Sequence, residues 1–155
     1  MYALKRWIYH GNRPGWIAQR LNKVWEAFHS SRFGPDHWVT LEVIGRKSGK
    51  IISLPVVAAI VEEQLYLVSM LGSEAQWVQN ARAAHGKAFI RKVSRREVRL
   101  EEVPVEQRAV ILKDYLQRAP GARPHFPVSK DAPLKDFEAI APLFPAFRIV
   151  PYLGE

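Results

Sequence analysis

Two strand-like runs that flank a short basic loop constrain the fold of this chain more than any other feature. From His37 to Ile44, apolar residues alternate with polar ones, as in a strand buried on one face. From Ile51 to Val61, the sequence is more continuously apolar, as in a strand buried on both faces. The loop between them reads GRKSGK and carries three cations. We therefore expect two neighbouring strands joined by a strongly basic turn.

This loop does not have the spacing of a P-loop. A P-loop has four residues between its glycines and a Ser or Thr after its lysine. Here three residues separate Gly45 from Gly49, and Ile51 follows Lys50. A P-loop lysine is also followed by a helix, whereas IISLPVV is β-branched and contains Pro55. Taken alone, the loop is compatible with a solvated hairpin tip or with a phosphate site.

The remaining periodicities predict an α+β chain. Glu62–Gln64 is a turn, and Ser73 is the expected N-cap of a helix that Gly86 ends. The order of strands, one helix, a hairpin and peripheral helices favours a small antiparallel barrel or curled sheet over a doubly wound sheet. The other expected elements are a strand over 65–70, the helix over 73–85, a hairpin over 87–103, helices over 105–118 and 134–141, a proline-rich loop over 119–127 and a closing strand over 145–153.

The positive charge is concentrated near the N-terminus. The net charge is +8, and six Lys or Arg residues up to Arg32 face the single acid Glu26. An amphipathic helix is expected from about Pro14 to Ser30, because apolar residues recur there at helical spacing. With Trp16 and Trp25 beside that apolar stripe, the helix could lie on an anionic membrane or pack on the domain with a solvated basic face.

Few residue patterns point to catalysis by side chains. The five histidines have no metal-binding spacing, so no metal site is predicted, and no GxSxG motif is present. The absence of cysteine fits a cytoplasmic protein, and neither a signal peptide nor a membrane span is expected. No nucleic-acid partner is predicted, because the RKVSRREVR segment has cations without aromatic residues between them.

In combination, several of these segments resemble a known family. VTLEVIGRKSGKIISLPVV, followed by QLYLVSMLGSEAQWVQNARA and the hairpin, is similar to the deazaflavin-dependent nitroreductases, with their TGRKSGxxRxxPL and LVxS…W..N patterns. The resemblance runs from about Trp38 to about Glu102. It implies one split β-barrel domain over 1–155, of the FMN-binding flavin-reductase type, with six to seven strands. It also implies binding of coenzyme F420 and hydride transfer to a quinone-like or nitroaromatic acceptor.

The resemblance also implies a set of cofactor-binding residues. The loop glycines and cations would hold the polyanionic handle of F420, and the later residues would lie beside the ring or fix the covering helix. A proton donor would come from Tyr66, Tyr115 or His125, among which the sequence does not choose. The predicted cofactor residues are Gly45, Arg46, Lys47, Ser48, Gly49, Lys50, Pro55, Val57, Ser69, Trp77 and Asn80.

The chain departs from the family pattern at two places. Ile52 stands where the family has an arginine, and Met70-Leu71-Gly72 is shorter and uncharged compared with the family's turn. The alternative is therefore a non-catalytic split barrel that binds FMN, a tetrapyrrole or a lipid. The expected partners are a small-molecule substrate and a second copy of the chain, with a peripheral membrane contact through the N-terminal helix.

Overall fold

The computed structural model describes residues 38–152. The amphipathic helix predicted over about 14–30 lies outside these residues, and so does any membrane contact made through it. Within 38–152, no helix is long and apolar enough to cross a membrane. A single domain over 1–155 stays a prediction.

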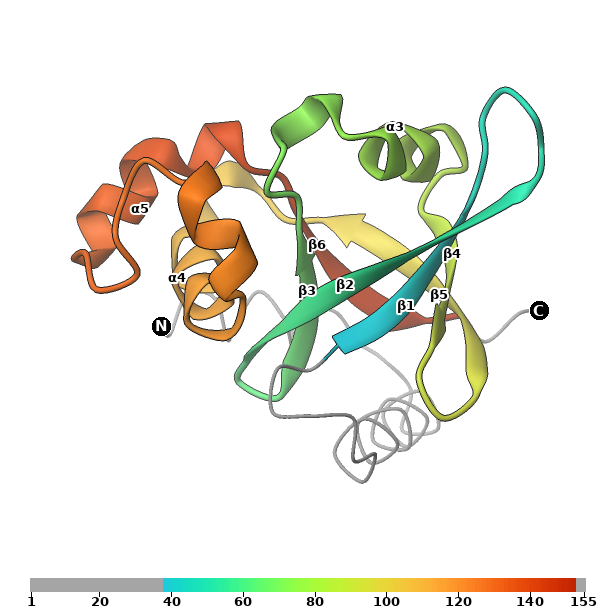
Figure 1. Ribbon diagram of the computed structural model, residues 1–155, viewed down its shortest axis with the longest axis horizontal. Helices are drawn as coiled ribbons and strands as arrows, with labels where there is room; N and C mark the ends of the chain where they lie inside the picture. Colours follow the sequence, from blue (N-terminus) through green and yellow to red (C-terminus); the bar gives the residue numbers. More distant parts are fainter. Residues whose placement is uncertain (1–37, 153–155) are drawn as a thin grey trace.

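Six antiparallel strands close into a barrel (Figure 1). Their order around the barrel is β1-β2-β3-β6-β5-β4, so the first strand pairs with both β2 and β4. The predicted α+β antiparallel barrel is confirmed, with six strands. The strands are β1 (Trp38–Ile44), β2 (Ile51–Val61), β3 (Gln64–Val68), β4 (Lys87–Arg91), β5 (Arg95–Glu102) and β6 (Ala146–Pro151).

The longest strand, β2, has two unlike halves. Residues 51–57 pair with β1 on one edge, while residues 58–61 pair with β3 on the other. From Val57 onward the strand is largely buried, but Ile51, Ile52, Ser53 and Pro55 are exposed. The prediction of a strand buried on both faces is therefore wrong for the half nearest the loop, because the described cluster under α4 and α5 includes Val57, Ala59 and Val61 but no residue of 51–55.

Helix α3 (Gln76–Ala83) follows the barrel strand β3 and begins later than predicted. Ser73 is not its N-cap, because Ser73 lies in a short 3-10 turn, η1 (Gly72–Glu74). Ala75 then has an extended backbone and occupies the N-cap position without a capping side chain. The helix also ends earlier than predicted, at Ala83. His85 is the first left-handed residue after it, with a φ of +56°, and Gly86 completes the terminal turn, since its N–H donates to the carbonyl of Ala81 at 2.8 Å.

Two further helices lie together on one side of the barrel (Figure 1). Helix α4 packs against β2 and β3, and α5 packs against α4. The loop predicted over 119–127 is mostly a 3-10 segment. The remaining helical elements are η2 (Val105–Gln107), α4 (Ala109–Arg118), η3 (Pro120–His125), α5 (Leu134–Ile140) and η4 (Ala141–Leu143).

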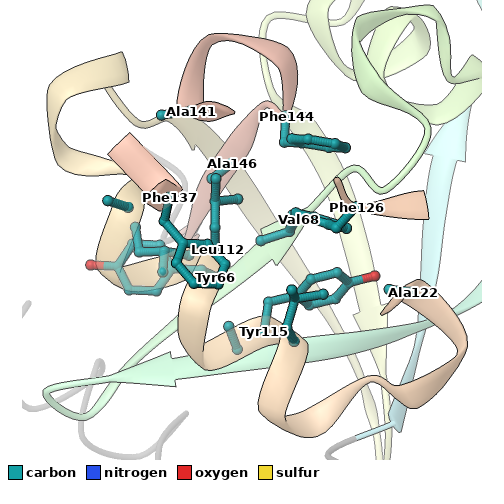
Figure 2. Packing of buried hydrophobic residues seen from close by; sticks show 14 of the residues in the cluster. Tyr66, Val68, Leu112, Tyr115, Ala122, Phe126, Phe137, Ala141, Phe144 and Ala146 are labelled. Carbon is teal, nitrogen blue, oxygen red and sulfur yellow. The ribbon is translucent and has the colours of Figure 1, made fainter. Parts of the chain in front are cut away.

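The alternation of side chains along the strands creates two hydrophobic clusters. One fills the barrel with residues such as Leu41, Leu67 and Ile90, and α3 contributes Val78 and Ala81 to it. The other lies between the outer face of β2 and β3 and the helices α4 and α5 (Figure 2). It contains a stacked ring pair, Phe126 and Phe144, with centroids 4.0 Å apart. The barrel is thus covered on the α4–α5 side, while α3 is attached to its interior.

Candidate functional site

The basic loop forms a compact turn at the tip of the β1–β2 hairpin. The N–H of Gly45 donates to the carbonyl of Lys50, and the N–H of Gly49 donates to the carbonyl of Gly45, both at 2.8 Å. Gly49 has a φ of +73°, which favours glycine. The hydroxyl oxygen of Ser48 accepts a bond from the N–H of Lys50 at 3.1 Å. The two glycines and the serine therefore shape the loop itself.

Asn80 connects this loop to α3. Its Oδ1 accepts hydrogen bonds from the main-chain N–H of Arg46 at 3.1 Å and from Arg46 Nη1 at 2.7 Å. Asn80 is only 3% exposed and lies between Val78 and Ala81 on the buried side of the helix. Because α3 is embedded in the barrel cluster, this bond holds the first cation of the loop in a defined place. The sequence predicts Asn80 as a cofactor-binding residue, but it does not predict the hydrogen bonds between Asn80 and Arg46.

The other two cations of the loop remain exposed. Within residues 38–152, neither Lys47 nor Lys50 has an ion pair, and the main-chain N–H groups of Lys47 and Ser48 donate to no protein acceptor. Two lysines and two neighbouring amides thus face solvent around one short turn. Such a set of donors suits a ligand with several negatively charged oxygens.

Pro55 and Val57 lie on the outer face of β2. The resemblance implied that both residues lie on the strand beside the ring system of the cofactor. Pro55 is exposed, whereas Val57 is buried in the cluster under α4 and α5. The opposite face of the same strand carries Leu54 and Val56, which pack partly buried against the barrel cluster. Neither of these two residues was predicted, because the continuous apolar run of β2 does not show which of its faces is turned inward.

Ile52 continues this inner face of β2 toward the loop. It is 44% exposed, and a Cβ added at Gly45 would lie 3.1 Å from its Cδ1. Trp77 of α3 belongs to the same barrel cluster and packs edge-on against Phe147, with ring centroids 5.5 Å apart. We call Ile52, Leu54, Val56 and Trp77 the apolar strip, since all four belong to the inner side and none is fully buried.

Ser69 has a structural role at the end of β3. It is buried, its N–H donates to the carbonyl of Pro145 at 2.9 Å, and its hydroxyl donates to the carbonyl of Gly72 at 2.6 Å. These bonds hold the segment that leads into η1 and α3. The hydroxyl proton is therefore engaged within the turn.

The three candidate proton donors do not gather at the loop. Tyr66 and Tyr115 lie in the cluster under the helices, and burial raises the pKa of Tyr115 to about 12 (Figure 2). His125 is exposed at the end of η3. Helix α4 is attached through Asp114, which accepts from the N–H of Ile60 at 2.9 Å. At roughly 3.3 Å per residue, Ile60 is about 30 Å along β2 from Ile51, the residue that follows the basic loop.

In the part of the chain that the structure describes, no three His, Cys, Asp or Glu residues form a group that could hold a metal ion.

No protein-family model matches the chain, and no curated protein matches it in sequence. Solved structures match at low identity. One is an F420-H2 dependent reductase (FDR-A), at 17% identity and a TM-score of 0.50, covering 72% of this chain and 92% of that one. Another is a putative 5-nitroimidazole antibiotic resistance protein from Bacteroides thetaiotaomicron, at 11% identity and a TM-score of 0.55, covering 81% of this chain and 78% of that one.

A third structural match is the heme binding protein from Mycobacterium smegmatis, at 12% identity and a TM-score of 0.53. The match covers 90% of this chain and 52% of that protein, so the chain spans about half of its length. Similarity at these identities concerns the fold, which an F420-H2 dependent reductase, a putative antibiotic resistance protein and a heme binding protein all share. The chain therefore has the split β-barrel fold of flavin-reductase-like proteins.

Proposed function

We propose that this chain is an F420H2-dependent oxidoreductase that acts on a quinone-like or nitroaromatic acceptor. The observation that carries the proposal is the basic loop, whose Arg46 is fixed by Asn80 while Lys47 and Lys50 remain exposed. The sequence resemblance to deazaflavin-dependent nitroreductases and the shared fold with an F420-H2 dependent reductase both support it. Localisation in the cytoplasm stays a prediction.

The residues of the loop fit the anionic handle of this cofactor. F420 carries a phosphodiester and an oligoglutamate tail, so it needs several cationic or N–H donors. Lys47, Lys50 and the amides of Lys47 and Ser48 are such donors, without competing acids in the described residues. Each charge-assisted hydrogen bond contributes roughly 1.5–3 kcal/mol, so two or three of them account for micromolar binding together with ring contacts.

The apolar strip fits a planar ring better than the outer-face residues do. Leu54 and Val56 belong to the same strand that the loop precedes, and Ile52 lies between them and the loop. A ring against this strip would be shielded from water on one side, with its anionic tail directed to the lysines. When bound, reduced F420 supplies the hydride, and the protein's task is to position it and exclude water.

A titration followed by tryptophan fluorescence tests the proposal. F420, FMN and NADPH are titrated separately into the full chain, and then into Lys47→Ala and Lys50→Ala variants. We expect saturable micromolar binding of F420 alone, weakened about tenfold by each substitution without loss of the folded state. Binding of FMN but not F420 would identify FMN as the cofactor instead. The absence of a response to all three compounds would contradict the proposal that the chain is an enzyme.

A second candidate is a non-catalytic split barrel that binds a tetrapyrrole, FMN or a lipid. It is favoured by the fold shared with a heme binding protein, and Ile52 in place of the family's arginine removes one expected partner of F420. An absorption spectrum of the protein reconstituted with hemin distinguishes the two candidates. A stoichiometric Soret band together with failure to bind F420 would favour the second.

We also propose that the chain forms a homodimer. Over residues 51–57, the edge of β2 opposite β1 pairs with no strand in the described residues, and Ile51 and Ile52 are exposed there. An open apolar edge of this kind tends to pair with another chain. Light scattering coupled to size-exclusion chromatography measures the oligomeric state, and a monomer at micromolar concentration would contradict the proposal.

A further inference from the structure

The end of the barrel opposite to the basic loop carries a second positively charged surface. The hairpin of β4 and β5 turns over residues 92–94, and residues 91–99 contain five Lys or Arg and one acid. In Figure 1 this hairpin projects at the lower right, away from the loop that joins β1 and β2. We call Trp38 together with residues 91–96 the hairpin tip surface.

Exposed apolar side chains accompany these cations. Val93 lies in the turn and is 69% exposed, and Trp38 at the start of β1 is 48% exposed. β1 pairs with β4 with Thr40 opposite Arg91, so continuing the register by two residues places Trp38 level with Val93. An indole and an aliphatic side chain thus stand at the same level of the barrel, beside a run of cations.

The acids near the hairpin do not neutralise it. Glu42 is buried and accepts bonds from both Arg91 and Arg95, at 2.9 Å and 2.6 Å. The single carboxylate of Glu42 therefore forms ion pairs with two arginines. Arg96 is exposed and has no ion pair within residues 38–152.

We propose that the hairpin tip surface docks on an anionic lipid bilayer. Trp and small apolar side chains insert at the interface of a membrane, while Lys and Arg near its surface are attracted by anionic headgroups. Single-stranded nucleic acid fits less well, because it needs open aromatic faces for base stacking. The guanidinium of Arg95 lies 3.8 Å from the centroid of Phe89, and that of Arg99 lies 4.4 Å from that of Tyr152.

Vesicle binding by the full chain tests this surface. Co-sedimentation is measured with vesicles of phosphatidylcholine alone and with added phosphatidylglycerol, for the wild type and a Val93→Glu, Arg96→Glu variant. We expect binding only to the anionic vesicles, weakened by salt and about tenfold or more by the double substitution. Lys135→Glu, an exposed change of charge on α5, is the control and retains binding. Val93→Glu alone replaces the double variant if the latter unfolds.

Three results would overturn the proposal. The first is that the wild type does not bind the anionic vesicles. The second is that the tip variant binds them as well as the wild type does, and the third is that the Lys135→Glu control loses as much binding as the tip variant. Preferential binding of a single-stranded RNA oligonucleotide, lost in the same tip variant, would assign the surface to nucleic acid instead. Because the tip lies at the other end of β1 from Lys47 and Lys50, F420 titration of the tip variant separates this result from the proposed function.

Discussion

Asn80 on α3 accepts two hydrogen bonds from Arg46, a residue 34 positions earlier in the chain. The same oxygen receives the main-chain N–H and the guanidinium, so the backbone and the side chain of the loop are both tied to a buried helix position. The loop is thereby joined to the segment that also carries Trp77. The position of Arg46 therefore depends on a residue of α3 as well as on the loop.

Substitution of Asn80 tests this relationship. Asn80→Asp keeps an acceptor for Arg46 but adds a negative charge beside the proposed anion site. We expect thermal stability to be retained and F420 affinity to fall about tenfold, because like charges oppose each other at close range. Asn80→Ala instead leaves a part-buried N–H without its acceptor, and it lowers the free energy of unfolding by about 1–3 kcal/mol. Equal affinity of the Asn80→Asp variant and the wild type would show that the ligand lies elsewhere.

The proposed function predicts that an arginine at position 52, where the deazaflavin-dependent nitroreductases that the sequence resembles have one, strengthens binding of F420. Ile52 is exposed next to the base of the loop, so Ile52→Arg can place a guanidinium near the tail at little cost in stability. One added charge-assisted hydrogen bond corresponds to about a tenfold lower Kd for F420. Ile51→Arg is the matched control, since Ile51 is equally exposed, at 46%, but points to the other face of β2. An equal gain in both variants would indicate general attraction rather than a local contact.

A side chain at position 86 is expected to destabilise the folded protein. Its φ is +87°, and an added Cβ would lie 2.6 Å from the carbonyl oxygen of Leu100 in β5. Gly86→Ala should lower the free energy of unfolding by about 2–4 kcal/mol, from backbone strain together with displacement of a barrel strand. Gly121→Ala is the control, because nothing lies within 4 Å of its added Cβ. Urea denaturation of both variants measures the difference, and similar midpoints would contradict the expectation.

The barrel should lose stability in acid, because protonation of Glu42 removes its attraction to Arg91 and Arg95. Hydrogen bonding by Arg95, with further attraction from Arg91, lowers the pKa of this carboxyl below its usual value. A depressed pKa in the folded state means that the stabilisation is present above the unfolded-state pKa, about 4.3, and disappears as the pH falls through the folded value. Glu42→Gln should therefore weaken stability at neutral pH by about 1–3 kcal/mol and flatten its decline below about pH 4. Glu138→Gln, on the exposed side of α5, should change neither.

The strands, their hairpins and the turn that follows α3 could be predicted from the sequence, because these depend on alternation and turn chemistry over a few residues. Gly86 marked the terminal turn of its helix, and the basic loop was expected between two strands. Ser73 was misassigned because a serine before a helical pattern does not reveal the 3-10 turn that precedes α3. The apolar strip was missed because continuous apolar character hid which face of β2 is turned inward.

The sequence by itself determined the local elements and the concentration of cations in the loop and the β4–β5 hairpin. Only the tertiary structure decided that Asn80 meets Arg46, that Tyr66 and Tyr115 lie under the helices, and that Trp38 stands level with Val93. Such relationships depend on the closure of the barrel, which pairs β1 with β4 and β3 with β6 over long separations. They arise from the packing of whole elements against one another, so no window of neighbouring residues contains them.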